Sequence, residues 1–262
     1  MVGGTALNWS AKQYAAFEDE RTRPVRDLLG ALPVIHARSV IDLGCGPGTS
    51  TEVLATRYPQ AQIAGIDSSP DMIAAARERL PHIRFRVEDV QTWRDPGSFD
   101  VILANAVLHW LHDHESLMPR LVECLEPGGA LAVQMPDNLD EPAHRLMRQI
   151  AQDGPWAAKL AGASAVRTPL ASAEWYYELL KPHCARVDIW RATYYHALPG
   201  GAAAIAEWFK GSGLRPFLDP LSDDERTAYL LDFKHGMEKT YPSRADGSVL
   251  LPFPRLFMVA IR

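Results

Sequence analysis

The chain of 262 residues is 47% hydrophobic and 23% charged, so it is long enough to bury one α/β core and to carry an elaboration of that core. A formal net charge of −5 with no lysine or arginine run argues against nucleic acid as a partner, and the lack of any apolar run of about 18 residues argues against a membrane-spanning helix. The three cysteines are widely separated, so we expect neither a disulfide framework nor a zinc site. The first residues do not resemble a secretory signal, and we therefore expect a cytoplasmic protein.

The first predicted element is a helical segment over residues 9–32. Ser10 is followed three residues later by Gln13, which is the form of a capping box, so a helix is expected to begin there. Apolar positions recur at helical spacing on both sides of Pro24. Proline removes a backbone donor, and we therefore expect the helix to break at that residue.

Between residues 38 and 104, short β-rich runs alternate with stretches of helical period, and glycine or proline turns separate them. This alternation is typical of βαβ units, which build a parallel sheet with right-handed crossovers. The expected strands are 39–43, 62–67, 83–88 and 99–104, and the expected helices are 49–57 and 70–79.

The second half of the chain begins with a helix expected over about 114–125, after which Gly128 and Gly129 mark a turn. Residues 137–170 are rich in Ala, Gly, Pro and charge and contain no clear strand, so they are interpreted as an insertion that covers the site. The other expected elements are strands over 130–135, 186–196 and 255–261 and helices over 172–180, 202–210 and 223–239.

Together these elements predict a single α/β domain over residues 1–262. It would have a Rossmann-like fold, with a mostly parallel seven-stranded sheet, an antiparallel closing strand and helices on both faces. The segments 137–170 and 200–245 would form a helical cap, in addition to the N-terminal helical segment 9–32. No internal repeat or low-complexity tract interrupts this organisation.

A glycine-rich turn, Gly44-Cys45-Gly46-Pro47-Gly48, follows the first expected strand and precedes a helix. Gly44 and Gly46 allow the backbone to come close to a ligand, and the start of the helix presents unsatisfied N–H groups. The spacing is G-x-G-x-G, whereas a nicotinamide dehydrogenase needs G-x-G-x-x-G to hold a pyrophosphate. The dehydrogenase alternative is therefore disfavoured, and a shift of the melting temperature by NADH would test it.

With Asp42 two residues before Gly44, the turn resembles the first motif of class I methyltransferases, whose cofactor is S-adenosylmethionine. Asp67 ends the second expected strand, where an acidic side chain can accept both hydrogen bonds of a ribose diol. Ser68, beside it, could instead cap the next helix.

The resemblance also implies that an aspartate after the third strand binds the adenine amino group and that its neighbour lies against the ring; these are Asp89 and Val90. Asn105, after the fourth strand, would face the methionine part of the cofactor. The predicted cofactor-binding residues are Asp42, Gly44, Cys45, Gly46, Asp67, Ser68, Met72, Asp89, Val90 and Asn105.

A narrower resemblance extends over nearly the whole chain. The strings WSAKQY (residues 9–14), FEDERTRP (17–24), ANAVLHW (104–110) and VQMPDN (133–138) resemble the trans-aconitate 2-methyltransferase family, as do residues 207–216 and 253–257. This resemblance implies methyl transfer from S-adenosylmethionine to one carboxylate of trans-aconitate, with a monomethyl ester and S-adenosylhomocysteine as products.

Two alternatives stay open. Part of the 207–216 segment is similar to one in malonyl-acyl carrier protein methyltransferases, which would need a basic docking surface that this sequence does not indicate. A protein that binds the cofactor without catalysis is the alternative from a different class, and turnover of labelled cofactor with a small acid would exclude it.

A tricarboxylate substrate would need local positive charge, because each buried carboxylate left without a partner costs several kcal/mol. Arginine's planar fork binds carboxylates in bidentate fashion. Trp110 and Tyr241 are expected to line the rest of the substrate site. The candidate arginines are Arg21, Arg215 and Arg255, ranked ahead of Arg23, Arg167 and Arg244.

Methylation of a carboxylate needs no general base, because a group with a pKa of about 4 is already ionised at pH 7. Tyr14 and His109 are therefore predicted only to position the substrate. No metal is expected, and Asp137, Asp140 and Glu141 lack partners at ligand spacing, which disfavours metal-dependent catechol methylation. The predicted partner is a small-molecule tricarboxylate, with neither nucleic acid nor membrane, and a monomer is favoured.

Overall fold

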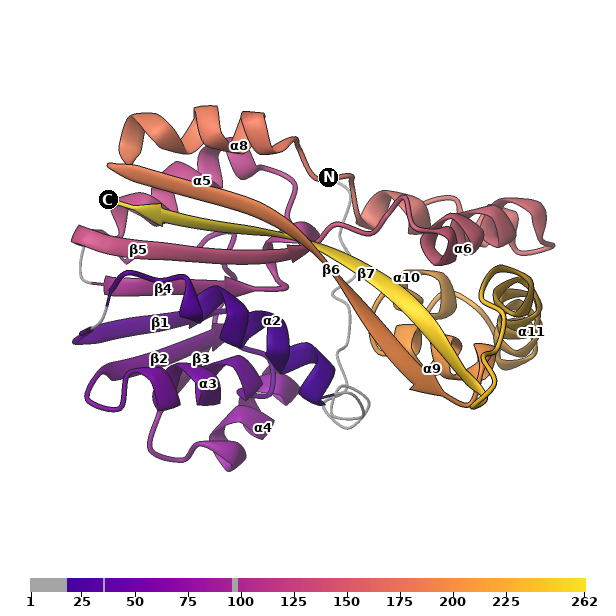
Figure 1. The fold of residues 1–262 in the computed structure, drawn as a ribbon. Coiled ribbons are helices and arrows are strands. Elements are labelled where there is room, and N and C mark those ends of the chain that lie inside the picture. Colours follow the sequence, from indigo (N-terminus) through magenta and orange to yellow (C-terminus); the bar gives the residue numbers. More distant parts are fainter. Residues whose placement is uncertain (1–17, 35, 96–98) are drawn as a thin grey trace. The chain divides into compact units, whose positions relative to one another are not determined.

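The computed structural model describes residues 18–34, 36–95 and 99–262, and these divide into two compact units (Figure 1). The sheet unit takes the described residues up to 136 together with 170–192 and 255–262, and the helical unit takes 137–169 and 193–254. Both predicted cap segments fall almost wholly in the helical unit. Whether the whole chain acts as one domain stays a prediction.

The predicted sheet is confirmed. In the described part of the chain seven strands form one sheet with the order β3-β2-β1-β4-β5-β7-β6. Strands β1 to β5 pair in parallel, while β7 runs antiparallel to β5. The strands are β1 (Ser39–Leu43), β2 (Gln62–Asp67), β3 (Arg84–Val87), β4 (Phe99–Asn105), β5 (Leu125–Pro136), β6 (Arg186–Pro199) and β7 (Ser248–Ile261).

The helices of the sheet unit lie on both faces of the sheet (Figure 1). They are α2 (Glu18–Gly30), α3 (Thr49–Arg57), α4 (Pro70–Arg79), α5 (His114–Glu123) and α8 (Ala173–Leu180), with short 3₁₀ turns η2 (Leu108–Trp110) and η4 (Lys181–His183). Those of the helical unit are α6 (Pro142–Asp153), α7 (Ala157–Leu160), α9 (Ala202–Lys210), α10 (Arg215–Leu218) and α11 (Asp223–Thr240), with η3 (Ala163–Val166).

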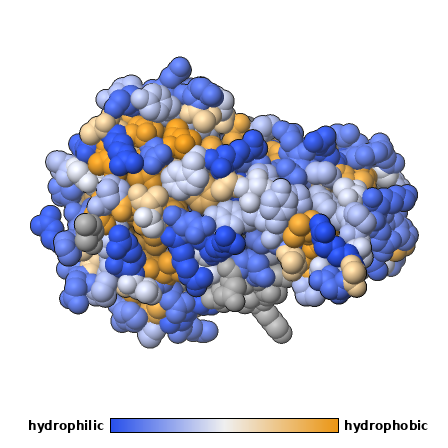
Figure 2. Space-filling model, in the orientation of Figure 1, coloured by the Kyte–Doolittle hydropathy of each residue, from blue (hydrophilic) through white to orange (hydrophobic). Residues whose placement is uncertain are grey.

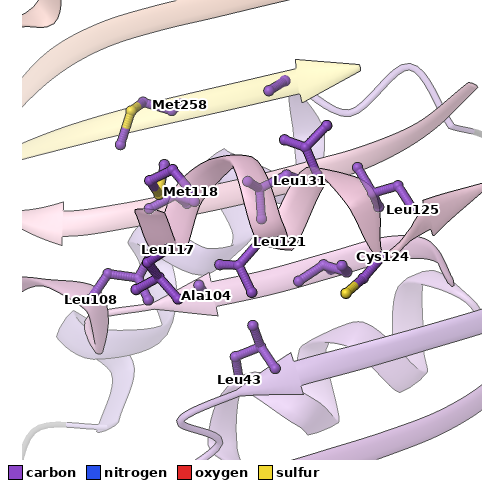
Figure 3. Packing of buried hydrophobic residues seen from close by; sticks show 14 of the residues in the cluster. Leu43, Ala104, Leu108, Leu117, Met118, Leu121, Cys124, Leu125, Leu131 and Met258 are labelled. Atoms are coloured by element: carbon purple, nitrogen blue, oxygen red, sulfur yellow. The ribbon is translucent and has the colours of Figure 1, made fainter. Parts of the chain in front are cut away.

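The core of the sheet unit follows from the alternation of side chains along its strands. Ile41 and Leu43 of β1 are fully buried in a cluster that includes Leu117 and Leu121 of α5. Figure 3 shows the α5 side chains packed over Leu131 of β5 and its neighbours. Because Asp42 lies between Ile41 and Leu43, its side chain points to the opposite face, where α3 begins.

Three features of the predicted elements are wrong. Pro24 lies inside α2, because a proline removes one backbone hydrogen bond without ending every helix. Strand β5 begins at Leu125, because Leu125 pairs with Phe99 before an irregularity in the register and the glycine turn lies inside the strand. Strand β7 begins at Ser248 although two prolines follow. The predicted helix start at Ser10 lies outside the described residues.

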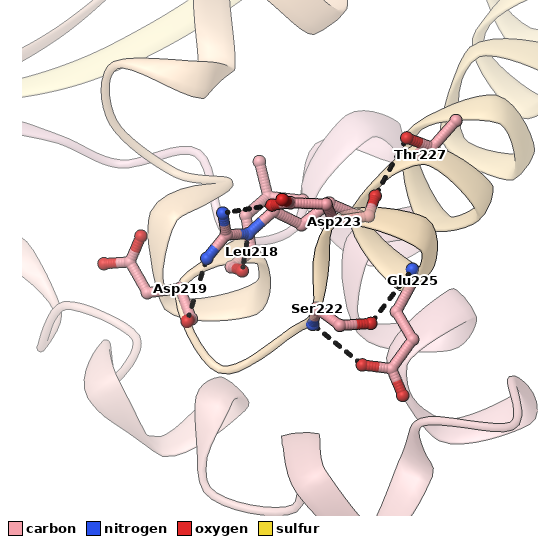
Figure 4. A network of polar contacts seen from close by, with 7 residues as sticks. Leu218, Asp219, Ser222, Asp223, Glu225 and Thr227 are labelled. Carbon is pink, nitrogen blue, oxygen red and sulfur yellow. Dashed lines mark hydrogen bonds and ion pairs between the residues drawn. The ribbon is translucent and has the colours of Figure 1, made fainter.

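The helical unit is held together by its longest helix, α11. Ser222 and Glu225 form a reciprocal capping box at its start (Figure 4). Lys159 Nζ lies 2.6 Å from Glu225 Oε1, which ties α7 to the same turn. The Tyr229 hydroxyl donates to the backbone oxygen of Met147 at 2.7 Å, so α11 is also fixed to α6.

Exposed hydrophobic residues gather over the sheet unit along β6, beside α8 (Figure 2). This location agrees with the topology, because β6 is an edge strand and its first half is only partly buried. The Trp190 ring stacks on Phe257 of β7, with ring centroids 5.0 Å apart. Among the described residues, no helix is both long and apolar enough to cross a membrane.

Candidate active site

The glycine turn between β1 and α3 has a left-handed backbone at each of its three glycines. Gly44, Gly46 and Gly48 have φ angles of 67°, 54° and 88°, which L side chains rarely adopt. A Cβ on Gly44 would lie 2.4 Å from Val107 Cγ2, so packing excludes any side chain there. A Cβ on Gly46 would meet nothing within 4 Å. The backbone at Gly46 therefore has open space in front of it, as a ligand that contacts this turn requires.

Asp42 supports this turn from inside the protein. Its side chain is fully buried, and its Oδ2 accepts hydrogen bonds from Ser50 Oγ and Thr51 Oγ1, both at 2.7 Å. Burial raises the pKa of Asp42 to about 7, although the two hydroxyl groups lower it. In the structure Asp42 thus fixes the start of α3 behind the turn, and its contact with the cofactor stays a prediction.

Asp67, at the end of the neighbouring strand β2, holds the glycine turn by a hydrogen bond. Its Oδ2 accepts the backbone N–H of Gly46 at 3.0 Å, and its Oδ1 accepts that of Ser69 at 2.9 Å. Burial raises the pKa of this carboxyl group against those hydrogen bonds. Each carboxylate oxygen has a second lone pair, and the side chain is partly exposed, so Asp67 can still accept from a diol.

The structure also describes three other residues of the predicted cofactor set, Cys45, Ser68 and Met72. Cys45 and Met72 are 2% and 3% exposed, and the Cys45 side chain packs with Ile73 and other core residues. Any contact of Cys45 with a ligand is thus limited to its backbone. Ser69, not Ser68, caps α4 through its hydroxyl, which accepts from Met72 N–H at 3.4 Å. Ser68 is exposed.

The residues after β3 and β4 complete the carboxyl edge of the sheet. Asp89 is exposed, and its Oδ1 accepts the N–H of Gln91 at 2.8 Å, while Val90 beside it is buried. Asn105 ends β4, and no described residue lies within hydrogen-bond distance of its buried Oδ1. The next residue, Ala106, has a φ of 54°, unusual for a non-glycine residue.

These observations fit S-adenosylmethionine. A buried amide oxygen without a donor suits the ammonium group of an amino-acid tail, and a carboxylate on the neighbouring strand suits a ribose diol. The open space at Gly46 lies in the turn that Asp67 fastens. The individual cofactor contacts stay predictions.

Arg255 is a buried cation at the same edge of the sheet. It is 5% exposed, and its Nη1 donates to Gln134 Oε1 at 3.2 Å. Arg255 of β7 is registered with Pro136 of β5, and Gln134 is registered with Asn105 of β4. The predicted substrate arginine and the predicted cofactor residue therefore lie on β7 and β4, the two strands on either side of β5, which carries Gln134.

His109 and Trp110 occupy the 3₁₀ turn η2 that follows β4. His109 is buried, and its ring lies 4.9 Å from that of Trp110 at 43°. Tyr14 lies outside the described residues, and of Arg21 only its place in α2 is described. Their predicted roles are unchanged by the structure.

Two predicted substrate residues belong to the helical unit. The Arg215 side chain is 14% exposed, and its Nε lies 3.9 Å from Oδ2 of Asp219, the C-cap of α10. Tyr241 is the C-cap of α11 and is buried, which raises the pKa of its hydroxyl to about 12. Tyr241 is consequently neutral at physiological pH.

Arg167 has stronger local support than its low rank in the sequence suggested. Both of its Nη atoms contact Asn138 Oδ1, at 3.4 and 3.3 Å. Burial lowers the pKa of Arg167 to about 10, although the negative charge of Asp137 raises it in part. Asn138 is the last residue of the string VQMPDN, so the residue that Arg167 contacts lies in a segment that the sequence analysis singled out.

Comparison with known proteins gives the family. A family model described as a methyltransferase domain matches residues 40–129. The trans-aconitate 2-methyltransferase of Azoarcus sp. (strain BH72) is 51% identical over 97% of this chain and 99% of its own. That of Methylobacterium nodulans is 53% identical over 97% of this chain and 98% of its own. The chain belongs to the trans-aconitate 2-methyltransferase family.

Solved structures resemble this member of the trans-aconitate 2-methyltransferase family in fold. A Haemonchus contortus phosphoethanolamine N-methyltransferase 2 bound to phosphomonomethylethanolamine and S-adenosylhomocysteine is 17% identical, with a TM-score of 0.54 over 92% of this chain and 52% of its own. Geranyl diphosphate C-methyltransferase from Streptomyces coelicolor is 14% identical, with a TM-score of 0.52 over 95% of this chain and 82% of its own. The likeness agrees with the class I methyltransferase fold predicted from the glycine turn.

Proposed function

We propose that the protein methylates one carboxylate of trans-aconitate, with S-adenosylmethionine as the methyl donor and with a monomethyl ester and S-adenosylhomocysteine as products. The observation that carries this proposal is identity of 50–53% with proteins named trans-aconitate 2-methyltransferase over 97% of the chain. Bound S-adenosylmethionine supplies an electrophilic methyl group on a sulfonium centre.

The protein's part begins with holding the cofactor at the carboxyl edge of the sheet. Asp67 binds the ribose diol and Asn105 accepts from the methionine ammonium group, while the backbone of Gly44 and Gly46 lies against the ligand. Asp89 binds the adenine amino group, with Val90 against the ring. These assignments are supported by the polar groups that lie at or just after the ends of β2, β3 and β4.

Arginines bind the carboxylates that do not react. Charge falls as the carboxylate becomes an ester, so a guanidinium held tightly on the reacting oxygen would stabilise the ground state more than the transition state and slow the step. Arg255, which Gln134 orients, and Arg215, which is largely buried, are the candidates with described side chains. Arg21 is the third candidate from the sequence.

Positioning supplies most of the catalysis. The nucleophile is already ionised at neutral pH, so no residue has to remove a proton. Holding the reacting atoms in line can contribute roughly 7–11 kcal/mol through effective molarity. Tyr14, His109, Trp110 and Tyr241 are therefore assigned to positioning and to lining the substrate site.

His109→Gln tests this view of catalysis. Because His109 is not a general base, the variant is expected to keep measurable turnover, with a loss in kcat well below about a thousandfold. Initial rates at saturating cofactor and substrate provide the measurement. A larger loss in kcat at unchanged substrate and cofactor binding would instead identify His109 as a catalytic acid or base.

The function itself is tested with a panel of acceptors. Methyl transfer from labelled S-adenosylmethionine would be measured with trans-aconitate, cis-aconitate, isocitrate, citrate and malonyl-acyl carrier protein. We expect kcat/KM for trans-aconitate to exceed the others by about a hundredfold or more. Turnover of the carrier protein alone would refute the proposal, and so would the absence of turnover with every acid.

A further inference from the structure

Gln134 and Asn105 lie side by side at the carboxyl edge of the sheet. Gln134 is near the end of β5, and its Cα is registered with that of Asn105, the last residue of β4. Registered residues on neighbouring strands project to the same face of a sheet, so the two amide side chains share one face. The Ala106 N–H donates to the Gln134 backbone oxygen at 2.8 Å, which ties the turn after β4 to the same residue. All three residues belong to the sheet unit.

Each of the two amides has one buried polar atom that no described residue bonds. Gln134 is fully buried, and within the described ranges nothing lies within hydrogen-bond distance of its Nε2. The corresponding atom of Asn105 is Oδ1. One atom is a donor and the other an acceptor, yet they do not bond to each other. Because proteins rarely leave buried polar groups without a partner, the pair indicates a ligand site with groups of both kinds.

Arg255 fixes which way the Gln134 amide is turned. Its Nη1 donates to Gln134 Oε1 at 3.2 Å. The reverse orientation of the amide would place an NH₂ group against a guanidinium, which has donors only. Arg255 is registered with Pro136, two residues beyond Gln134, so it lies on the same face of the sheet. The contact therefore uses the amide oxygen of Gln134 and leaves its NH₂ group to donate to an acceptor.

The strand order indicates what that acceptor is. Strands β2, β1, β4, β5 and β7 follow one another across the sheet. Under the proposed function Asp67 of β2 holds the ribose and Asn105 of β4 holds the methionine part of the cofactor. Gln134 lies one strand beyond Asn105, on the side away from the ribose. It is thus beside the cofactor's methionine part but outside the strands that hold the cofactor, where the methyl acceptor has to lie.

We propose that Gln134 Nε2 donates to the reacting carboxylate of the substrate, on the oxygen that does not attack the methyl group. This inference rests on the proposed function, because it names a binding residue for that substrate. The hydrogen bond fixes the plane of the carboxylate for in-line attack and leaves the attacking oxygen without a donor. Negative charge falls as the ester forms, and a neutral N–H opposes that loss less than a guanidinium would.

Two variants of Gln134 separate this role from that of orienting Arg255. Gln134→Glu keeps an acceptor for Arg255 but replaces the donor by a negative charge, while Gln134→Met removes donor and acceptor at similar volume. At saturating trans-aconitate and S-adenosylmethionine, kcat is expected to fall about 10–100-fold in Gln134→Met, as for a lost hydrogen bond to a charged group, and further in Gln134→Glu. A milder effect of Glu than of Met, with the loss in KM and kcat within about threefold, would mean that Gln134 only orients Arg255 and would overturn the inference.

Cofactor binding shows on which molecule the lost contact lay. Thermal unfolding first establishes that each variant is folded, and calorimetric titration then gives the dissociation constant of S-adenosylmethionine. This constant is expected to stay within about twofold of the wild-type value in both variants. A folded variant that binds the cofactor at least about tenfold more weakly would assign the Gln134 donor to the cofactor's own carboxylate and overturn the inference.

The control is Gln62→Glu, which adds the same charge at an exposed glutamine that begins β2, at the opposite edge of the sheet. It is expected to leave all kinetic constants within about twofold. An unchanged kcat in both Gln134 variants would overturn this inference while wild-type turnover of trans-aconitate still supported the proposed function. Absence of wild-type turnover would refute the proposed function itself.

Discussion

Gly46→Ala is expected to weaken S-adenosylmethionine binding at least about tenfold. The backbone at Gly46 has a φ of 54°, and a Cβ there would point into space that no described atom within 4 Å occupies. If the cofactor lies against this turn, the added methyl group occupies part of the cofactor's space or forces the cofactor away from Asp67. Calorimetric titration of the purified protein with S-adenosylmethionine provides the dissociation constant.

Gly128→Ala is the matched control for Gly46→Ala. Gly128 also has a left-handed backbone, with a φ of 82°, and a Cβ there would likewise meet nothing within 4 Å. Both variants should lose roughly 1–2 kcal/mol of stability from the unfavourable dihedral, as urea unfolding would show. Only Gly46→Ala should lose affinity for the cofactor. Equal affinities in the two variants would mean that the cofactor does not contact the turn.

The bounds of β1, α3, β2 and α4 could be predicted residue by residue. In this stretch glycine, proline and polar residues separate short β-rich runs from helical ones, so local signals agree with the fold. The same use of proline as a boundary signal made the predicted start of β7 wrong. Pro252 and Pro254 argue against a strand, because proline cannot donate to a ladder, yet β7 includes both.

The positions of the site residues were easier to predict than their contacts. The order of polar residues at the ends of β2, β3 and β4 follows from the sequence, because parallel strands end at one edge. The partners of Asp42 were not predicted, although the alternation along β1 places its side chain on the α3 face. A strand-end carboxylate looks alike in sequence whether it faces a ligand or two hydroxyl groups.

Arg167 illustrates the limit more directly. Its contact, Asn138, lies 29 residues earlier, and the intervening helices α6 and α7 bring the two together. No periodic pattern or motif spacing encodes such a pair. Ranking arginines by sequence segment could therefore name Arg167 as a candidate, but only the tertiary structure links it to a buried amide.

Asp42→Asn is expected to remove a pH dependence of stability. The pKa of Asp42 is raised from 3.8 to about 7 chiefly by burial, so the folded protein keeps this proton at pH values where the unfolded chain has lost it. Stability therefore falls as the pH rises from about 4 to about 7, by up to about 4 kcal/mol from this group. Above the folded-state pKa the penalty is constant, and below the unfolded-state value it vanishes.

The measurement compares urea unfolding of the wild type and Asp42→Asn, without cofactor, at pH values from 4 to 8. The amide places an NH₂ where no described acceptor meets Oδ1, so the variant is expected to be less stable at low pH. The decisive quantity is the pH dependence of the difference in unfolding free energy between the two proteins, since the contributions of other carboxylates cancel in it.

Ser50→Ala removes one hydroxyl donor that lowers the pKa of Asp42, so the folded-state pKa is expected to rise. The decrease in stability with rising pH should therefore continue to a higher pH in Ser50→Ala than in the wild type. A difference that stays constant from pH 4 to 8 would mean that Asp42 is charged throughout and that its two hydroxyl partners outweigh its burial.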